Sequence, residues 1–434
     1  MRAELAARYG PRTANVRRMG PSRETHDLNG SRCRTQHQAL REPKGDATMR
    51  MSLICCPFNT SYGEYGSSLK SAIESKTGGT MQWVGSNCGC GDAMEVSRQF
   101  ITDQCDYFEM PILRDARSRT AWQREAAGAA RTVLLYFRAK RYAELSKDAE
   151  LVHFQQVVNA TGSKAVFHWL KQPSTATRIV TIHELDADQL ASPDVNEAYN
   201  RADAIIVHCD AMRQQLVELG VRPEKVHVVL CGTDIPERSQ EKRDGIVFYG
   251  GHHIMTGKGL DTLFRAMSVI REQRPLSVPT LTIHGHYGTL TPDAAMLLAK
   301  DFGIADKIVW RNQISSEEMV KLYQRSLVCV LPYTGGFAGL PASTAAACEL
   351  PVVATRTAGL PDHLGESGIW VDENDPDQLA SRVLELLDND GSWQRAAAGV
   401  RKRAEELLSW DVIAENTLQV YEQAIANRTI AAAR

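Results

Sequence analysis

Lys258 stands between two glycines, Gly257 and Gly259, directly before a helical run at residues 260–270. The free N–H groups at a helix start attract anions, and a nearby ammonium adds positive charge. Such a group can bind phosphate and stabilise the charge on a departing phosphate. The alternative is a solvated lysine in a surface turn. Phosphate binding is therefore a candidate role for Lys258.

The loop before Lys258 contains Gly251, His252 and His253. Neutral histidines can donate hydrogen bonds, and a bound phosphate would raise their pKa and favour their charged form. We therefore count these three residues as candidate contacts of an anionic ligand. The alternative, held equally, is that both histidines are ordinary polar loop residues.

A second candidate segment, residues 334–344, joins a strand-like run to a helix-like run. Its glycines allow the backbone to approach a ligand closely, and its hydroxyls lie near a helix start, where an oxygen can also act as a cap. We predict ligand contacts here, with simple capping as the alternative for the hydroxyls. The candidates are Thr334, Gly335, Gly336, Ser343 and Thr344.

In the first half of the chain, a Gly-rich segment at residues 62–68 follows the first strand-like run. We predict a strand-to-helix loop able to approach phosphates or an acceptor, formed by Gly63, Glu64, Tyr65 and Gly66, although such turns also serve packing. His183 follows an apolar run, where the chain should emerge at the carboxyl edge of a sheet. It is our first-half candidate for a catalytic residue, and His153 is a weaker candidate for the acceptor side. A structural role is the alternative for both.

Short apolar runs that alternate with helical stretches position these residues. Such alternation indicates parallel sheets with helices on both faces. The pattern occurs twice, so we predict an α/β fold of two doubly wound, Rossmann-like domains facing across a cleft, where ligands bind at the carboxyl ends of the strands. The strand-like runs begin near residues 51, 151, 178, 204 and 225, and again near 245, 280, 307, 327 and 351.

The predicted organisation has four parts. Residues 1–48 lack an apolar period and resemble a disordered extension, either translated from too early a start or serving targeting or regulation. Residues 49–236 and 237–408 are expected to form the two Rossmann-like domains. Residues 409–434 include a final helix that can return to the first domain.

Composition narrows the function classes. A net charge of -2 over 434 residues argues against nucleic-acid binding by bulk electrostatics. No apolar run is long enough to span a bilayer, and we expect a cytoplasmic protein, with weak attachment to a membrane surface as an option. The ten cysteines are scattered, without paired CxxC spacing, and only Cys88, Cys90 and Cys105 are candidates for a structural metal site. Cys209, Cys231, Cys329 and Cys348 are expected to be small buried hydrophobic residues.

Ordered segments in both halves resemble glycosyltransferase family 4, over about residues 51–426. In the first half these are Glu150-Leu-Val-His153, Thr181-Ile-His-Glu184, Ala202-Asp-Ala-Ile-Ile-Val-His208 and residues 226–234. In the second half they are Lys258-Gly-Leu260, Leu322-Tyr323 leading into 328–332, Gly339-Leu-Pro341, Glu349-Leu-Pro-Val-Val-Ala-Thr355, Ala358-Gly-Leu-Pro361, Asp377-Gln-Leu-Ala380 and Ser409-Trp410.

The resemblance implies the GT-B fold, with residues 49–236 on the acceptor side and residues 237–408 on the donor side. It also implies sugar transfer from a nucleotide-activated donor, with retention of configuration. It implies no cofactor and no bound metal: the nucleotide-sugar is the substrate, and the acceptor is unknown. In the family, a histidine near the position of His183 lies by the transferred sugar, and a lysine at the position of Lys258 contacts the donor.

The donor site departs from the family at three points. The family has two glutamates separated by seven residues, and those positions are occupied here by Gly336 and Thr344. The arginine that precedes the Lys-Gly turn in the family is missing. Two alternatives to a nucleotide-sugar transferase follow: a non-catalytic binding or partner subunit, and a transferase that uses a sugar phosphate or a lipid-linked sugar.

Overall fold

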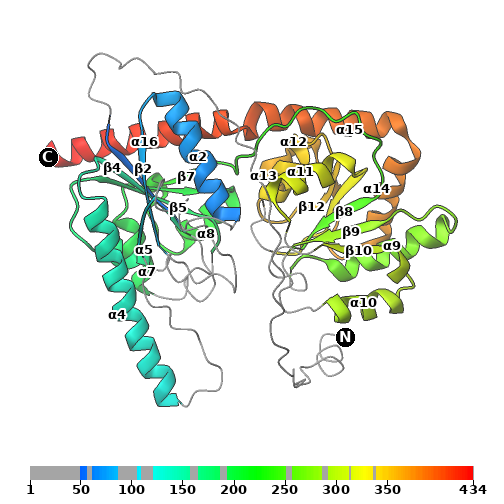
Figure 1. Cartoon of the computed structure of the whole chain (residues 1–434), viewed down its shortest axis with the longest axis horizontal. Coiled ribbons are helices and arrows are strands. Elements are labelled where there is room, and N and C mark those ends of the chain that lie inside the picture. The colour runs from blue at the N-terminus through cyan, green and yellow to red at the C-terminus, as the bar shows by residue number, and fades with distance from the viewer. Residues whose placement is uncertain are drawn as a thin grey trace, which may run out of the picture. The chain divides into compact units, whose positions relative to one another are not determined.

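The computed structural model describes residues 49–55, 61–86, 105–108, 121–156, 165–185, 193–250, 257–285, 292–311, 314–335 and 339–433. All of them belong to one compact unit, Met49–Arg434. This unit contains two parallel sheets flanked by helices (Figure 1). The prediction of a doubly wound α/β fold in two halves is confirmed.

The first sheet has seven strands in the order β3-β2-β1-β4-β5-β6-β7. Neighbouring strands all run parallel. The order reverses between β1 and β4, which makes the carboxyl ends of these two strands the switch point of the sheet. The strands are β1 (Met51–Ile54), β2 (Met81–Ser86), β3 (Asp106–Phe108), β4 (Leu151–Gln156), β5 (Thr177–Ile182), β6 (Ala204–Val207) and β7 (Val226–Val228).

Alternating apolar residues cover both faces of this sheet. Leu151 and Ile179 pack toward one face, while their neighbours Val152 and Val180 pack toward the other, as the period of two in a strand requires. The first face is covered by α2 (Ser61–Thr77) and α16 (Trp410–Ala433). The second is covered by α4 (Ala121–Leu145), α5 (Ala165–Leu170), α7 (Pro193–Asn200) and α8 (Asp210–Glu218).

The second sheet has six parallel strands in the order β10-β9-β8-β11-β12-β13. Its switch point lies between β8 (Ile246–Tyr249) and β11 (Val328–Leu331). The other strands are β9 (Leu281–His284), β10 (Ile308–Arg311), β12 (Val352–Thr355) and β13 (Ile369–Val371). The flanking helices are α9 (Leu260–Gln273), α10 (Pro292–Asp301), α11 (Ser316–Arg325), α12 (Leu340–Ala347), α13 (Leu360–Leu364), α14 (Pro376–Asp388) and α15 (Asp390–Arg403).

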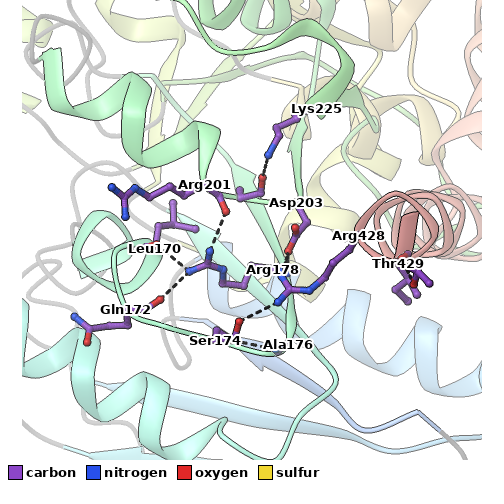
Figure 2. Close-up of polar contacts among 12 residues, drawn as sticks. Leu170, Gln172, Ser174, Ala176, Arg178, Arg201, Asp203, Lys225, Arg428 and Thr429 are labelled. Carbon is purple, nitrogen blue, oxygen red and sulfur yellow. Dashed lines mark hydrogen bonds and ion pairs between the residues drawn. The ribbon is translucent and has the colours of Figure 1, made fainter. Parts of the chain in front are cut away.

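The final helix, α16, is fixed to the first sheet by polar contacts along its length. Near its end, the Arg428 guanidinium donates to Asp203 Oδ2 and to the Ser174 carbonyl, both at 2.9 Å (Figure 2). Arg178 lies beside this pair and donates to the carbonyl oxygens of Leu170, Gln172 and Arg201. The cations of this cluster therefore serve mainly to satisfy backbone carbonyls at helix ends and to hold α16 in place.

Candidate functional site

Two of the predicted ligand-binding segments meet at the switch point of the second sheet. The Thr334 N–H donates to the Gly257 carbonyl at 3.0 Å, so the segment after β11 is hydrogen-bonded to the turn before α9. Gly257 and Gly259 have φ angles of 78° and 67°, a conformation that glycine adopts without steric cost. The fold therefore brings Lys258 together with Thr334 and Gly335.

Lys258 lies over an aromatic ring in this turn. Its Nζ is 4.0 Å from the centre of the Tyr333 ring, and the Tyr333 hydroxyl donates to the Tyr249 carbonyl at 2.8 Å. Burial lowers the pKa of Lys258 to about 8, partly offset by the Glu184 carboxylate, which raises it. The ammonium is still mostly protonated at pH 7, and an anion bound beside it would favour the charged form further. The arrangement is suited to hold a phosphate.

Ser343 and Thr344 are buried in α12 and use their hydroxyls internally. Ser343 Oγ donates to the Cys231 carbonyl at 3.0 Å, and Thr344 Oγ1 donates to the Leu340 carbonyl at 3.0 Å. The N-cap residue is Gly339, without a side-chain cap, so the alternative interpretation, in which one of these hydroxyls caps the helix, is wrong. Ser343 and Thr344 are the fourth and fifth residues of the helix, where backbone carbonyls are the nearer partners.

Residues 62–68 do not form the predicted loop. The helix α2 already begins at Ser61, so Gly63, Glu64, Tyr65 and Gly66 lie in its first two turns. A Cβ atom on Gly66 would be 2.7 Å from Cys55 Sγ, so this glycine permits close packing of the helix on β1. The side chain of Glu64 lies outside the described part of the structure. Glycine here indicated tight helix packing, which the sequence pattern could not separate from a loop.

Tyr65 packs against the first-half histidines. It is 5% exposed, and its ring meets the rings of His183 and Trp410 edge-on at centroid distances of 5.0 Å and 4.8 Å. Burial raises the pKa of its hydroxyl well above the ordinary value. Tyr65 therefore serves as a wall of the His183 environment, linking α2 to the start of α16.

His183 lies directly after β5, as predicted, and is 5% exposed. Its Nε2 is 2.7 Å from Gln155 Oε1, and its Nδ1 is 3.0 Å from His208 Nε2. Burial, together with the neighbouring His208 and His153, lowers its pKa well below the usual value. A sugar could use a ring nitrogen of His183 only after one of these contacts opens.

His153 is fully buried in the middle of β4. Its Nδ1 lies 2.6 Å from the Tyr421 hydroxyl and its Nε2 lies 2.7 Å from Thr181 Oγ1. Burial lowers its pKa to about 3. These contacts connect β4 to α16, so the structure places His153 beneath His183 in the packed interior.

His363, for which no sequence pattern was a signal, connects the two halves of the chain. Its Nδ1 donates to the Gly359 carbonyl at 2.7 Å, and its Nε2 accepts from the Cys231 N–H at 3.0 Å. The Cys231 carbonyl in turn accepts from Ser343. Both backbone groups of one first-half residue are thus bound by side chains of the second half. Gly339 packs against the His363 ring, where any Cβ atom would overlap it.

Several predicted residues lie outside the described residues: Gly251, His252, His253 and Gly336, and also Cys88 and Cys90. Cys105 is buried, and burial raises the pKa of its thiol to about 12. Cys209, Cys231, Cys329 and Cys348 are free and buried, as predicted. Within the described ranges, no group of three metal-ligating side chains comes together. Across those same ranges, no helix combines the length and apolar character needed to cross a membrane.

Comparison with known proteins finds two family models that match consecutive parts of the chain. Residues 110–237 match the model described as "Glycosyltransferase Family 4", and residues 243–389 match the model described as "Glycosyl transferases group 1". Of the similar proteins, the MMP alpha-(1->4)-mannosyltransferase of Mycolicibacterium hassiacum is 30% identical over 218 residues, covering 49% of this chain and 51% of that protein. The D-inositol 3-phosphate glycosyltransferase of Acidothermus cellulolyticus is 30% identical over 250 residues, covering 53% and 55%.

The chain thus spans about half the length of the curated relatives that it matches. Among solved structures, a variant of S. aureus TarM in complex with fondaparinux, alpha-GlcNAc-glycerol and UDP superposes with a TM-score of 0.65. That match covers 86% of this chain and 99% of TarM at 11% identity, so it supports the fold alone. Two glycosyltransferase domain models in sequence and a GT-B neighbour agree. The chain therefore carries a glycosyltransferase family 4 domain followed by a group 1 glycosyl transferase domain, in the GT-B fold.

Proposed function

We propose that this chain transfers a sugar from a nucleotide-activated donor to an acceptor, with retention of configuration. The observation that carries the proposal is the Lys258 turn at the switch point of the second sheet. There the ammonium, held over the Tyr333 ring, stands at the start of α9 and beside the backbone of Thr334 and Gly335. Ligands of open α/β sheets bind at this position.

Lys258 would stabilise the negative charge that develops on the departing diphosphate. The N-cap of α9 is Gly259, which has no side chain to occupy the N–H groups of the first turn. Those groups and the ammonium would act together on phosphate oxygens. A half-buried ammonium interacts more strongly with an anion than a fully solvated one, because less water screens the charge.

The glycine-rich backbone at Thr334, Gly335 and Gly336 would lie along the donor, with Gly251, His252 and His253 contributing from the loop before Lys258. His183 would border the transferred sugar from the first half. Ser343 is 0% exposed, so we no longer propose it as a donor contact. Its role is the hydrogen bond to the Cys231 carbonyl. Thr344 uses its hydroxyl on Leu340 and is 5% exposed, which leaves it at most a minor contact.

The names of the relatives suggest which substrates to test. They include a mannosyltransferase and several D-inositol 3-phosphate glycosyltransferases, and the TarM structure contains UDP. We therefore propose a UDP- or GDP-sugar as donor and a hydroxylated acceptor such as a sugar or an inositol phosphate. Each of these is a proposal for this chain.

Binding and turnover test the proposal in two steps. Purified chain is first melted with UDP, GDP or ADP, because a ligand that binds the folded state raises the melting temperature by mass action. Sugars of the nucleotide that stabilises are then offered with candidate acceptors, and product stereochemistry is read by NMR. Acceptor-dependent release of nucleoside diphosphate, with the donor's anomeric configuration kept, is expected. No stabilisation by any nucleotide or nucleotide-sugar, and no release, would contradict the proposal.

One observation favours a second candidate, a subunit that binds a nucleotide or partner without catalysis. The position where the family has its second glutamate is a threonine whose hydroxyl already bonds within its own helix. A carboxylate accepts hydrogen bonds more strongly than a hydroxyl, so its loss weakens the hold on donor hydroxyls. Nucleotide binding without turnover on any donor would support this candidate. Turnover that is lost in Lys258→Met would exclude it.

A further inference from the structure

A continuous line of buried polar side chains crosses the first sheet from α16 to β7. It runs from Tyr421 through His153, Gln155, His183 and His208 to a backbone carbonyl. The successive separations are 2.6 Å from Tyr421 to His153, 3.1 Å from His153 to Gln155, 2.7 Å to His183 and 3.0 Å to His208. Each of the five side chains is at most 5% exposed.

At the His208 end of this line, the direction of the hydrogen bond is determined by its partner. His208 Nδ1 lies 2.9 Å from the carbonyl oxygen of Val229. A carbonyl can only accept, so Nδ1 must carry a proton. Burial lowers the pKa of His208 to about 4, so its ring is neutral near pH 7 and its Nε2 is unprotonated. His183 Nδ1 must therefore be the donor in the contact with His208.

The assignment of donors and acceptors extends from His183 to Gln155. A neutral His183 with a proton on Nδ1 has a lone pair on Nε2, which needs a donor. Gln155 Oε1 cannot donate, but a half-turn of the amide exchanges its oxygen and nitrogen at almost no change in shape. If Oε1 faced His183, the ring would have to be protonated on both Nδ1 and Nε2 and would carry a positive charge. The burial of His183 disfavours that charge. We therefore assign the amide nitrogen of Gln155 to His183 and its oxygen to His153.

The remaining bonds then follow without conflict. His153 Nε2 donates to the Gln155 oxygen and to Thr181 Oγ1, and its Nδ1 accepts from the Tyr421 hydroxyl. Every hydrogen bond from Tyr421 to Val229 points the same way, and all three histidines are neutral. A single residue at the end of the line, His208, determines that direction because its partner is a carbonyl.

We propose that His208 is a positioning residue that fixes the tautomer of His183, with the proton on Nδ1 and the Nε2 lone pair turned to Gln155. This rests on the proposed function only in taking His183 as the residue that borders the transferred sugar. Positioning of this kind decides whether the ring offers a donor or an acceptor at the carboxyl end of β5. It also fixes the ring plane against Tyr65.

Among the described residues, two neighbours of His183 are neutral and leave this assignment unchanged. Tyr65 of α2 meets the ring edge-on, and its pKa is raised well above the ordinary value by burial, with Cys231 and Tyr421 contributing. The Cys231 thiol has its own pKa raised by burial, so it is neutral. Glu184, the next residue along the chain, acts electrostatically on Lys258 and Tyr249 and raises the pKa of each.

The test is NMR of full-length protein labelled with ¹⁵N-histidine, since protonated and unprotonated ring nitrogens have well-separated ¹⁵N shifts. Single His→Asn variants assign the signals. At pH 7 we expect His208 and His183 protonated on Nδ1 only, and His153 on Nε2 only. In His208→Asn, we expect the shorter amide side chain to keep a hydrogen bond to the Val229 carbonyl but to lose the contact with His183. We therefore expect His183 to lose its Nδ1–H preference and populate Nε2–H.

His227→Asn is the matched control, because this half-buried histidine lies on β7 outside the line. It should leave the three tautomers unchanged. A doubly protonated His183 at pH 7, or an unchanged His183 tautomer in folded His208→Asn, would overturn the proposal. The readout does not depend on turnover: if the protein transfers no sugar, the tautomers still test His208, and if the tautomers differ from these, sugar transfer is still tested separately.

Discussion

Gly259 packs its backbone directly against the carbonyl oxygen of Pro332, and a Cβ atom at residue 259 would overlap that oxygen. The contact joins the turn that carries Lys258 to the end of β11. Two features require glycine at residue 259: the left-handed φ of 67° and the lack of space for a Cβ atom. The position of the Lys258 ammonium therefore depends on a glycine at this residue.

Gly259→Ala should destabilise the protein by about 2–5 kcal/mol, from the left-handed backbone and the overlap together. Gly303 is the control that isolates the backbone effect, since its φ is 68° but nothing lies within 4 Å of its Cβ position. Gly303→Ala should therefore cost only about 1–2 kcal/mol. Urea unfolding of both variants measures the difference. Equal losses would show that the Pro332 contact is unimportant.

His363 should make the stability of the protein depend on pH. Burial lowers its pKa to about 4 from the ordinary 6.5, so the unfolded chain binds the proton more tightly than the folded chain. Its contribution is complete above about pH 6.5, is lost as the pH falls toward 4 and is constant below that. The 2.5-unit difference corresponds to roughly 3 kcal/mol.

The variant His363→Gln does not titrate and keeps an oxygen able to accept from the Cys231 N–H. Its free energy of unfolding should fall less steeply than that of the wild type between pH 6.5 and 4. Urea unfolding across this window is the measurement. Because His153, His208 and His284 also have lowered pKa values, part of the fall should remain in the variant. Parallel curves for variant and wild type would refute the assignment to His363.

A substitution at Ser343 distinguishes a structural role for this residue from a role in nucleotide binding. Ser343→Ala removes the donor to the Cys231 carbonyl in a fully buried position, which should cost about 1–3 kcal/mol of stability. Nucleotide affinity should change less than about twofold, because a residue with no exposed surface cannot touch the donor. Denaturation and calorimetric titration on one preparation give both numbers. A large loss of affinity with unchanged stability would return Ser343 to the donor site.

The sequence predicted the repeated sheets because buried parallel strands are continuous apolar runs, such as Ile246–Tyr249 and Val328–Leu331. The strands Met81–Ser86, Asp106–Phe108 and Ile369–Val371 were not predicted, and the last two are three-residue runs too short to show a period. The Lys258 turn was visible since a lysine between two glycines before a helix has few structural explanations. It is the part of the candidate site that a local pattern could reveal.

The contacts of the histidines could not be read from the sequence. His153, His183 and His208 are separated by 25 to 30 positions, and only the pairing of β4, β5 and β6 brings them into one line. His363 and Cys231 are 132 positions apart, the first in α13 and the second in the segment after β7. Hydrogen bonds across strands and between halves depend on register and helix placement, for which single residues carry no local signal.

Affinity for the nucleotide in Lys258→Met tests the central claim most directly. The substitution keeps the length of the side chain and its contact with Tyr333 while removing the charge. Calorimetric titration with the nucleoside diphosphate that stabilises the wild type should show roughly 10- to 100-fold weaker binding, equivalent to about 1.5–3 kcal/mol for a charge-assisted contact. Lys300→Met, an exposed lysine on α10, should bind like the wild type. Unchanged affinity and turnover in folded Lys258→Met would contradict the account.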